Sequence, residues 1–240
     1  MNTSRDIPAE KILFQNEACL VINKQPGEDS EFFLPVHRLD TPVSGCLLLA
    51  KTRDAAAFLG AAFARPEGSG ETIQKHYWAI TEMPTDEFRE ELHKGNRDSI
   101  PAEGELVHWL YENKKLNKAF AVPWNEGKAP HKGGYAPPKK AVLRYRVIGQ
   151  GERYLFLQIE LVTGRHHQIR AQLAAIGLRV KGDLKYGARR SEKSGCIRLH
   201  AFSLAFPNPL NHEEKIEVKA APPLDDSLWR AFAESAGLAK

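Results

Sequence analysis

The chain has no long apolar run and no leader-like start, which narrows the classes of protein that it can be. Hydrophobic residues make up 42% of its 240 positions. No stretch, however, approaches the roughly 20 consecutive apolar residues that a membrane-spanning helix needs. The first six residues are mostly polar and lack the apolar segment of a secretory signal. We therefore expect a globular protein, with no membrane partner, that resides in the cytoplasm.

Cysteine is also scarce. The chain has 3 cysteines, Cys19, Cys46 and Cys196, and they lie far apart, which argues against a disulfide framework or a zinc knuckle. We expect them to be reduced and mostly buried. His166 and His167 are adjacent, and no Glu, Asp or Cys stands beside them at ligand spacing. The sequence therefore predicts no metal site.

The charge balance is mildly basic, with 34 Lys and Arg against 30 Asp and Glu and a net charge of +4. This balance suits an anionic partner without identifying one. Residues 124–140 are rich in Gly, Pro and Lys and show no apolar period, which predicts a long, exposed, flexible basic loop. Two interpretations remain open. Either Trp124, Tyr135 and the lysines grip single-stranded nucleic acid, or the loop is a solvated insertion between two strands.

Short apolar runs bounded by Gly, Pro or Asn predict many strands and few helices. The expected strands are residues 12–14, 19–22, 44–51, 75–80, 105–111, 119–122, 141–148, 155–161, 197–206 and 215–218. Helices are expected at 53–64, at 167–176 and after Pro222 and Pro223, where Asp225 and Asp226 are candidate caps. This pattern indicates an α+β fold, with a large, mostly antiparallel mixed β-sheet, a few flanking helices and one domain spanning residues 1–240.

The first candidate site lies at residues 35–40, Pro-Val-His-Arg-Leu-Asp, just before the apolar run at 44–51. Asp40 is expected in a turn next to Arg38, at the entrance of a rigid strand. A nearby arginine keeps a carboxylate ionised, and an ionised, positioned aspartate can act as a nucleophile or a base. The alternative interpretation is a turn or capping aspartate without chemistry.

A second basic cluster opens the helix expected at 167–176, in the sequence Thr-Gly-Arg-His-His-Gln-Ile-Arg of residues 163–170. Arg165 and Arg170 suit phosphate binding or carboxylate pairing at a helix N-terminus, and structural salt bridging is the alternative. We expect these arginines and Asp40 to meet in one cleft. Tyr77 is either a core or edge tyrosine or a base-stacking residue, and Lys24 either contacts phosphate or is solvated.

Together these segments resemble the signatures of RluA-type RNA pseudouridine synthases, over nearly the whole chain. The likeness continues through residues 21–27, 75–79, 161–173, 182–187 and 199–207, in the family's order. The resemblance implies that Asp40 is catalytic, that Arg165 is its charge partner, and that Tyr77 stacks on the target base and assists proton removal. The further substrate-binding residues that we predict around a central RNA-binding cleft are Lys24, His37, Arg38, Lys75, Ile169, Arg170 and Leu173. Of these, Ile169 and Leu173 would pack beneath the site, and Arg38 would fill the space left by the flipped base.

The resemblance also implies a reaction and a partner. Isomerising uridine needs no cofactor, and the partner is RNA, ribosomal or transfer, rather than DNA, with the enzyme expected as a monomer. The small RNA-binding domain that many relatives carry in front is expected to be missing, and Thr41, Pro42, Val43 and Gln25 depart from the usual motifs. A non-catalytic RNA-binding or ribosome-assembly protein on the same fold is the alternative. A glycoside hydrolase would need a second carboxylate, for which Asp183 is the one candidate.

Overall fold

The computed structural model describes residues 7–28, 34–65, 72–84, 101–125, 135–192 and 195–238. Its chain divides into two compact units. Unit 1 comprises Met1–Tyr77 and Leu199–Trp229, and unit 2 comprises Trp78–Arg198 and Arg230–Lys240. The expectation of a single domain over residues 1–240 stays a prediction. Among the described residues, no helix has the length and apolar character to cross a membrane.

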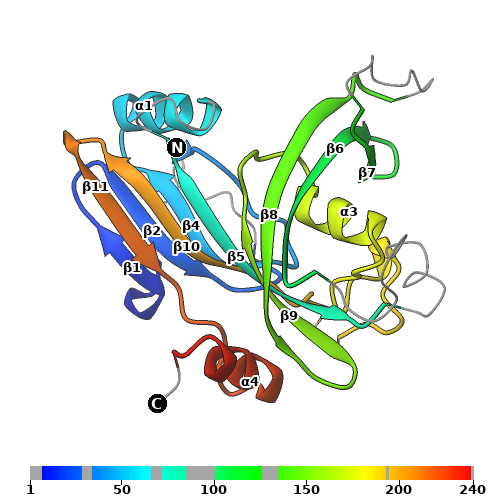
Figure 1. Ribbon diagram of the computed structural model, residues 1–240. Helices are drawn as coiled ribbons and strands as arrows, with labels where there is room; N and C mark the ends of the chain where they lie inside the picture. The colour runs from blue at the N-terminus through cyan, green and yellow to red at the C-terminus, as the bar shows by residue number, and fades with distance from the viewer. Residues whose placement is uncertain are drawn as a thin grey trace. The chain divides into compact units, whose positions relative to one another are not determined.

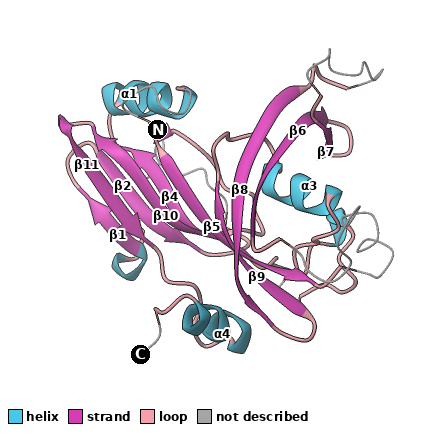
Figure 2. Ribbon diagram, viewed as in Figure 1, coloured by secondary structure: helices cyan, strands magenta, loops and turns pink. Residues whose placement is uncertain are grey.

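Unit 1 is built on a mixed sheet (Figures 1 and 2). Its strands are β1 (Ile12–Gln15), β2 (Cys19–Lys24), β3 (Leu34–Pro35), β4 (Ser44–Ala50), β10 (Leu199–Asn208) and β11 (Asn211–Lys219). The hydrogen-bonded order is β1-β2-β4-β10, with β3 on β4 and β11 on β10. Strands β4 and β10 run parallel, whereas β1–β2, β2–β4, β3–β4 and β10–β11 are antiparallel.

Strand β4 is buried at every position, as its apolar run predicted. Gly45 within it has φ +111°, and a Cβ there would lie 2.3 Å from the backbone oxygen of Ala201 in β10. Only glycine allows this close approach of the parallel neighbours. The helix α1 (Arg53–Ala64) follows, capped by the Thr52 hydroxyl, which accepts a hydrogen bond from the Ala55 N–H. Its Leu59 packs into the unit 1 core.

Unit 2 contains the antiparallel strands β6 (Glu103–Asn113), β7 (Lys118–Pro123), β8 (Lys139–Gln150) and β9 (Tyr154–Glu160), in the order β9-β8-β6-β7. The helix α3 (Gln168–Ala175) lies against this sheet and buries Leu110, Ala119, Ala141 and Ala171 with Tyr186. Strand β5 (Gln74–Glu82) is divided between the units after Tyr77.

The helix α4 (Ser227–Ser235) begins where the sequence predicted it, after the paired prolines. The Asp226 carboxylate accepts hydrogen bonds from the Leu228 and Trp229 N–H groups, at 3.0 and 3.1 Å. The expected α+β class and mixed sheet are confirmed, and the three cysteines are free. The sequence did not predict β3 or the short 3₁₀ helices η1 (Ala9–Lys11) and η2 (Leu184–Tyr186).

The basic loop expected at residues 124–140 falls largely on residues 126–134, which lie outside the described part of the chain. Strand β8 begins earlier than expected, because Lys139 and Lys140 pair with Leu110 and Trp109 of β6. The ring of Trp124 stacks on that of Trp109, with centroids 4.1 Å apart. The Lys140 ammonium lies 4.7 Å from the centroid of the Trp124 ring. The two ends of the predicted loop therefore lie together on unit 2.

Candidate active site

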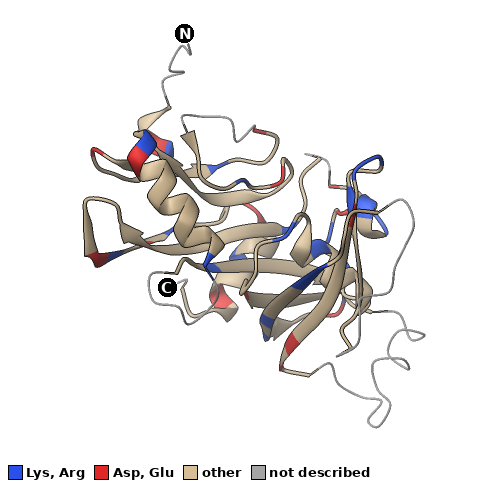
Figure 3. Ribbon diagram, turned by 90° about the horizontal axis from the view of Figure 1, so that it is seen from above, with Lys and Arg blue, Asp and Glu red and all other residues tan. Residues whose placement is uncertain are grey.

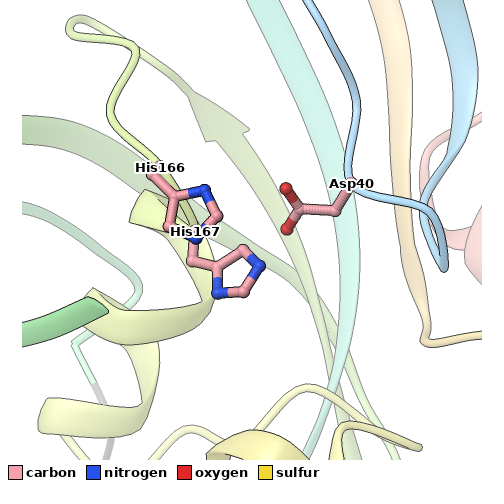
Figure 4. A group of neighbouring side chains, drawn as sticks. All are labelled: Asp40, His166 and His167. Atoms are coloured by element: carbon pink, nitrogen blue, oxygen red, sulfur yellow. The ribbon is translucent and has the colours of Figure 1, made fainter. Parts of the chain in front are cut away.

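Asp40 lies in unit 1, in a turn that leads directly into β4. The Val43 N–H donates to the Asp40 carbonyl at 2.9 Å, and the Gly27 N–H donates to the Thr41 carbonyl at 2.8 Å. Leu39 beside it is buried, whereas Asp40 itself is partly exposed. Figure 4 shows the carboxylate of Asp40 projecting from this loop. The backbone of the turn is thus fixed on both sides while the carboxylate stays accessible.

Lys24, at the end of β2, binds the backbone of this turn with its side chain. Its side chain is fully buried, and its ammonium donates to the carbonyls of Gln25 at 3.2 Å, Thr41 at 3.1 Å and Val43 at 2.9 Å. A buried ammonium needs such partners, because removing a charge from water is otherwise very costly. The geometry favours a positioning function for Lys24. Its predicted contact with substrate stays a prediction.

Replacing Lys24 with Met should both destabilise unit 1 and impair turnover. The Met side chain keeps the apolar stem but removes the buried ammonium that binds the carbonyls of Gln25, Thr41 and Val43, which we expect to cost about 3 kcal/mol of unfolding free energy. Urea unfolding and steady-state kinetics measure the two effects. Lys51→Met is the matched control, since the Lys51 ammonium donates to the carbonyl of Asn16 at 2.7 Å, away from Asp40. Equal losses in the two variants would contradict a specific function of Lys24 in the turn.

His37 and Lys75 both contact the ring of Phe63 in unit 1. His37 Nε2 accepts the Leu48 N–H at 2.9 Å, and its ring stacks on Phe63 with centroids 4.7 Å apart. The Lys75 ammonium lies 5.7 Å from the centroid of the same Phe63 ring. Burial, with a smaller effect of the Lys75 charge, lowers the pKa of His37 to about 3. His37 is therefore neutral at physiological pH. Arg38 is exposed, and the substrate contacts predicted for all three residues stay predictions.

Tyr77 lies on β5 in unit 1 and is 9% exposed. Burial is the main cause that raises the pKa of its hydroxyl, and the negative charge of Asp40 raises it further, with a contribution from Cys46. The structure therefore places the predicted catalytic residues Asp40 and Tyr77 within electrostatic reach of each other. The hydroxyl of Tyr77 keeps its proton at neutral pH, so this side chain is a neutral phenol rather than a phenolate base.

Arg165 lies in unit 2, in the loop between β9 and α3. The side-chain oxygen of Gln168 accepts hydrogen bonds from the Thr163 hydroxyl at 2.8 Å and from the Arg165 N–H at 2.9 Å. The amide nitrogen of Gln168 donates to the Val142 carbonyl at 3.0 Å. Gln168 thus ties the loop to β8, while the Arg165 side chain is exposed. The sequence analysis missed Gln168, whose one signal was its place at the first helical position, from which an amide can reach back to the loop.

Arg170 is part of a buried network in unit 2. Its guanidinium donates to both carboxylate oxygens of Asp183, at 2.6 and 2.8 Å, and the two side chains are 5% and 1% exposed. The guanidinium carbon lies 5.0 Å from the centroid of the Tyr186 ring. This arrangement favours the structural alternative for Arg170. Both carboxylate oxygens of Asp183, the candidate second carboxylate of a hydrolase, are bound by Arg170 in this arrangement. The predicted contact of Arg170 with substrate stays a prediction.

The same network holds the residue before α3 in an unusual conformation. His167 has φ +52°, in the left-handed region, and its Nδ1 lies 3.0 Å from the Tyr186 hydroxyl. The ring of His166 stacks on it, with centroids 3.9 Å apart, and Figure 4 shows both rings at the start of α3. Ile169 and Leu173 of α3 are buried. Such backbone strain is typical of functional sites, because the surrounding contacts must maintain it.

Within either unit taken alone, the described residues contain no group of three His, Cys, Asp or Glu side chains close enough to share a metal ion. The absence of a metal or cofactor stays a prediction. Unit 1 thus contains Asp40, Tyr77 and the buried Lys24 that binds the Asp40 turn. Unit 2 contains Arg165 on a loop fixed by Gln168. The predicted pairing of Arg165 with Asp40 stays a prediction as well.

Several known proteins are similar to this chain over most of its length. The chain is 27% identical to the ribosomal large subunit pseudouridine synthase C of Vibrio cholerae, covering 93% of this chain and 68% of that protein. It is 27% identical to the tRNA pseudouridine synthase C of Haemophilus ducreyi, covering 94% and 95%. The fold matches the solved structure of human RNA pseudouridylate synthase domain containing 4 with a TM-score of 0.67, at 21% identity over 97% of this chain and 95% of that one. The profile of the RNA pseudouridylate synthase family matches residues 8–175. The chain therefore belongs to the RNA pseudouridylate synthase family.

Proposed function

We propose that this protein isomerises specific uridines of ribosomal or transfer RNA to pseudouridine. Family membership supports the isomerase activity, and the names of two relatives support the two RNA classes. The observation that carries the proposal is the partly exposed Asp40 in a fixed turn, within electrostatic reach of a protonated Tyr77. We further propose that the enzyme is monomeric, that it resides in the cytoplasm, and that it acts on RNA rather than DNA.

The proposed reaction balances without a redox partner. The bond between N1 of the base and the ribose breaks, the base rotates, and ring carbon five forms the new bond to the ribose. Carbon five then loses its proton and N1 gains one. Before this, the target nucleotide must leave its stack, at a cost of a few kcal/mol. The chemistry therefore calls for one ionised group at the ribose or base and one group near carbon five.

In this proposal Asp40 is the nucleophile or base that acts on the nucleoside. Arg165 keeps Asp40 ionised and oriented, a function carried over from the family resemblance. Tyr77 stacks on the base, and its neutral hydroxyl relays the proton of carbon five. A phenol that keeps its own proton can relay one only if another group accepts it, and Asp40 is the carboxylate whose charge reaches Tyr77.

Mapping pseudouridines in cellular RNA tests this function directly. Pseudouridines carrying a carbodiimide adduct stop reverse transcriptase, so total RNA from strains with and without the gene can be compared site by site. We expect one or more stops to vanish without the gene and to return when it is restored. An unchanged set of stops, together with RNA binding by the purified protein, would support the non-catalytic alternative instead.

A further inference from the structure

Two basic segments of unit 2 carry lysines and arginines to which the proposed reaction assigns no function. The first is the turn between β6 and β7, residues 114–118, with the sequence Lys-Lys-Leu-Asn-Lys. The second is η2 and the residues after it, 184–190, with the sequence Leu-Lys-Tyr-Gly-Ala-Arg-Arg. Neither segment contains an acidic residue. Figure 3 colours the Lys and Arg positions of the ribbon blue and the Asp and Glu positions red.

The fold holds the two segments against each other. The Lys185 ammonium donates to the Asn117 carbonyl at 3.0 Å. The Tyr186 hydroxyl accepts the Ala119 N–H at 2.9 Å and donates to the Ala119 carbonyl at 3.1 Å. The Lys118 ammonium lies 5.0 Å from the centroid of the Tyr186 ring. Side chains that are about 70 residues apart in the sequence are therefore fixed on one surface, which we call the basic surface. Its cations are Lys114, Lys115, Lys118, Lys185, Arg189 and Arg190.

Little of this positive charge is neutralised by the protein itself. The N–H of Arg189 donates to the Glu82 carboxylate, at 3.0 and 3.2 Å, and its Nε lies 4.0 Å from the same group. Within the part of the chain that the structure describes, none of the other five cations forms an ion pair with a carboxylate. Lys114, Lys115, Lys185 and Arg190 are exposed. Like charges fixed in proximity repel one another, and an anionic partner relieves that repulsion.

The other side chains of the surface indicate which part of a nucleic acid it would contact. Tyr186 is 7% exposed and lies beneath the lysines, so its ring face is not available to stack on a base. Base stacking would need an exposed aromatic ring, and Tyr186 is the one aromatic residue of the two segments. Lysine ammonium groups suit phosphates, which carry no sequence information. Leu116 and Leu184 are exposed, but isolated exposed apolar residues are common on protein surfaces.

We propose that the basic surface binds the sugar-phosphate backbone of the RNA substrate at nucleotides other than the target uridine. The proposal rests on the proposed function, since it assigns the surface to the same RNA. Binding at this surface supplies affinity independent of sequence and leaves the choice of uridine to the active site. It also makes the affinity for RNA depend steeply on salt, because each phosphate contact releases counterions.

Four substitutions to glutamine test this assignment without touching Lys118, which packs on Tyr186, or Arg189, which contacts Glu82. The test variant changes Lys114, Lys115, Lys185 and Arg190. The matched control removes the same charge from four exposed cations elsewhere on the chain, Arg53, Arg153, Lys215 and Lys219. Filter binding of the transcribed RNA that carries the mapped uridine is measured at several KCl concentrations. Turnover is then measured at saturating RNA.

We expect the test variant to bind at least about tenfold more weakly than the control near 0.1 M salt. The slope of log K against log salt should become shallower by about three. The turnover rate at saturating RNA should be unchanged. Equal affinities and slopes in the test and control variants would overturn the assignment and leave the surface to another anion. Should the wild-type protein isomerise no uridine, the proposed function fails, and the salt slopes measured with rRNA and tRNA still decide whether this surface binds RNA.

Discussion

The variant Asp40→Asn is expected to fold and bind RNA but to form no pseudouridine. The amide keeps the size of the side chain and removes the negative charge that a nucleophile or base needs. The turn should survive, because its hydrogen bonds come from the backbone of Asp40, Thr41 and Val43 and from the buried Lys24. We expect the rate to fall by at least about 10³-fold, in line with losses on removing an activated nucleophile.

Release of tritium from ring carbon five of labelled uridine in transcribed RNA measures this loss. A thermal melt shows whether the variant is folded. Asp54→Asn is the matched control, since Asp54 is an exposed carboxylate in the first turn of α1 within the same unit. A folded Asp40→Asn protein that released tritium at the rate of the Asp54→Asn control would exclude Asp40 from the mechanism, and with it most of the case for the proposed reaction.

The elements that the sequence predicted best are those whose signals are local. The helix α1 begins and ends where the spacing of its apolar residues predicted, at 53 and 64. Strand β4 was recognised from its continuous apolar run, and α4 from the aspartate that caps it. In each of these elements the local signal, an apolar pattern or a helix cap, agrees with the tertiary structure. The two-residue strand β3 has no such signal, because its pairing with β4 is decided by long-range contacts.

The residues of the candidate site show the same difference between local signals and long-range contacts. Motif spacing and residue type brought Asp40, Tyr77 and Arg165 to attention, and the family resemblance gave them functions. Their surroundings depend on contacts that no local pattern encodes. The Lys24 ammonium reaches carbonyls 17 and 19 residues away. The partner of Arg170 is 13 residues away, across the end of α3. For Lys24 the sequence left phosphate contact and solvation open, and for Arg170 it left anion binding and a structural salt bridge open. The structure shows that both charged groups bind protein atoms.

The electrostatics of Tyr77 lead to the last prediction. A tyrosine with a raised pKa stays protonated at neutral pH and does not act as a phenolate base, but its neutral hydroxyl can still pass a proton along a hydrogen bond. The ring and the hydroxyl therefore have separable functions. The variant Tyr77→Phe keeps the ring and should bind RNA within about twofold of wild type, while its single-turnover rate should fall by about 10²-fold or more, the usual contribution of a positioned proton-transfer group. The variant Tyr77→Ala should lose both binding and turnover.

Rapid-quench measurement of pseudouridine formation at excess enzyme, with filter binding of the same RNA, separates these two functions. Tyr145→Phe is the matched control, because Tyr145 is a buried tyrosine of unit 2 whose pKa is also raised by burial. A loss of rate confined to Tyr77→Phe would assign proton transfer to the hydroxyl of Tyr77. A wild-type single-turnover rate in that variant would show that Tyr77 acts by stacking alone, and the carbon-five proton would then have to leave directly to Asp40 or to water.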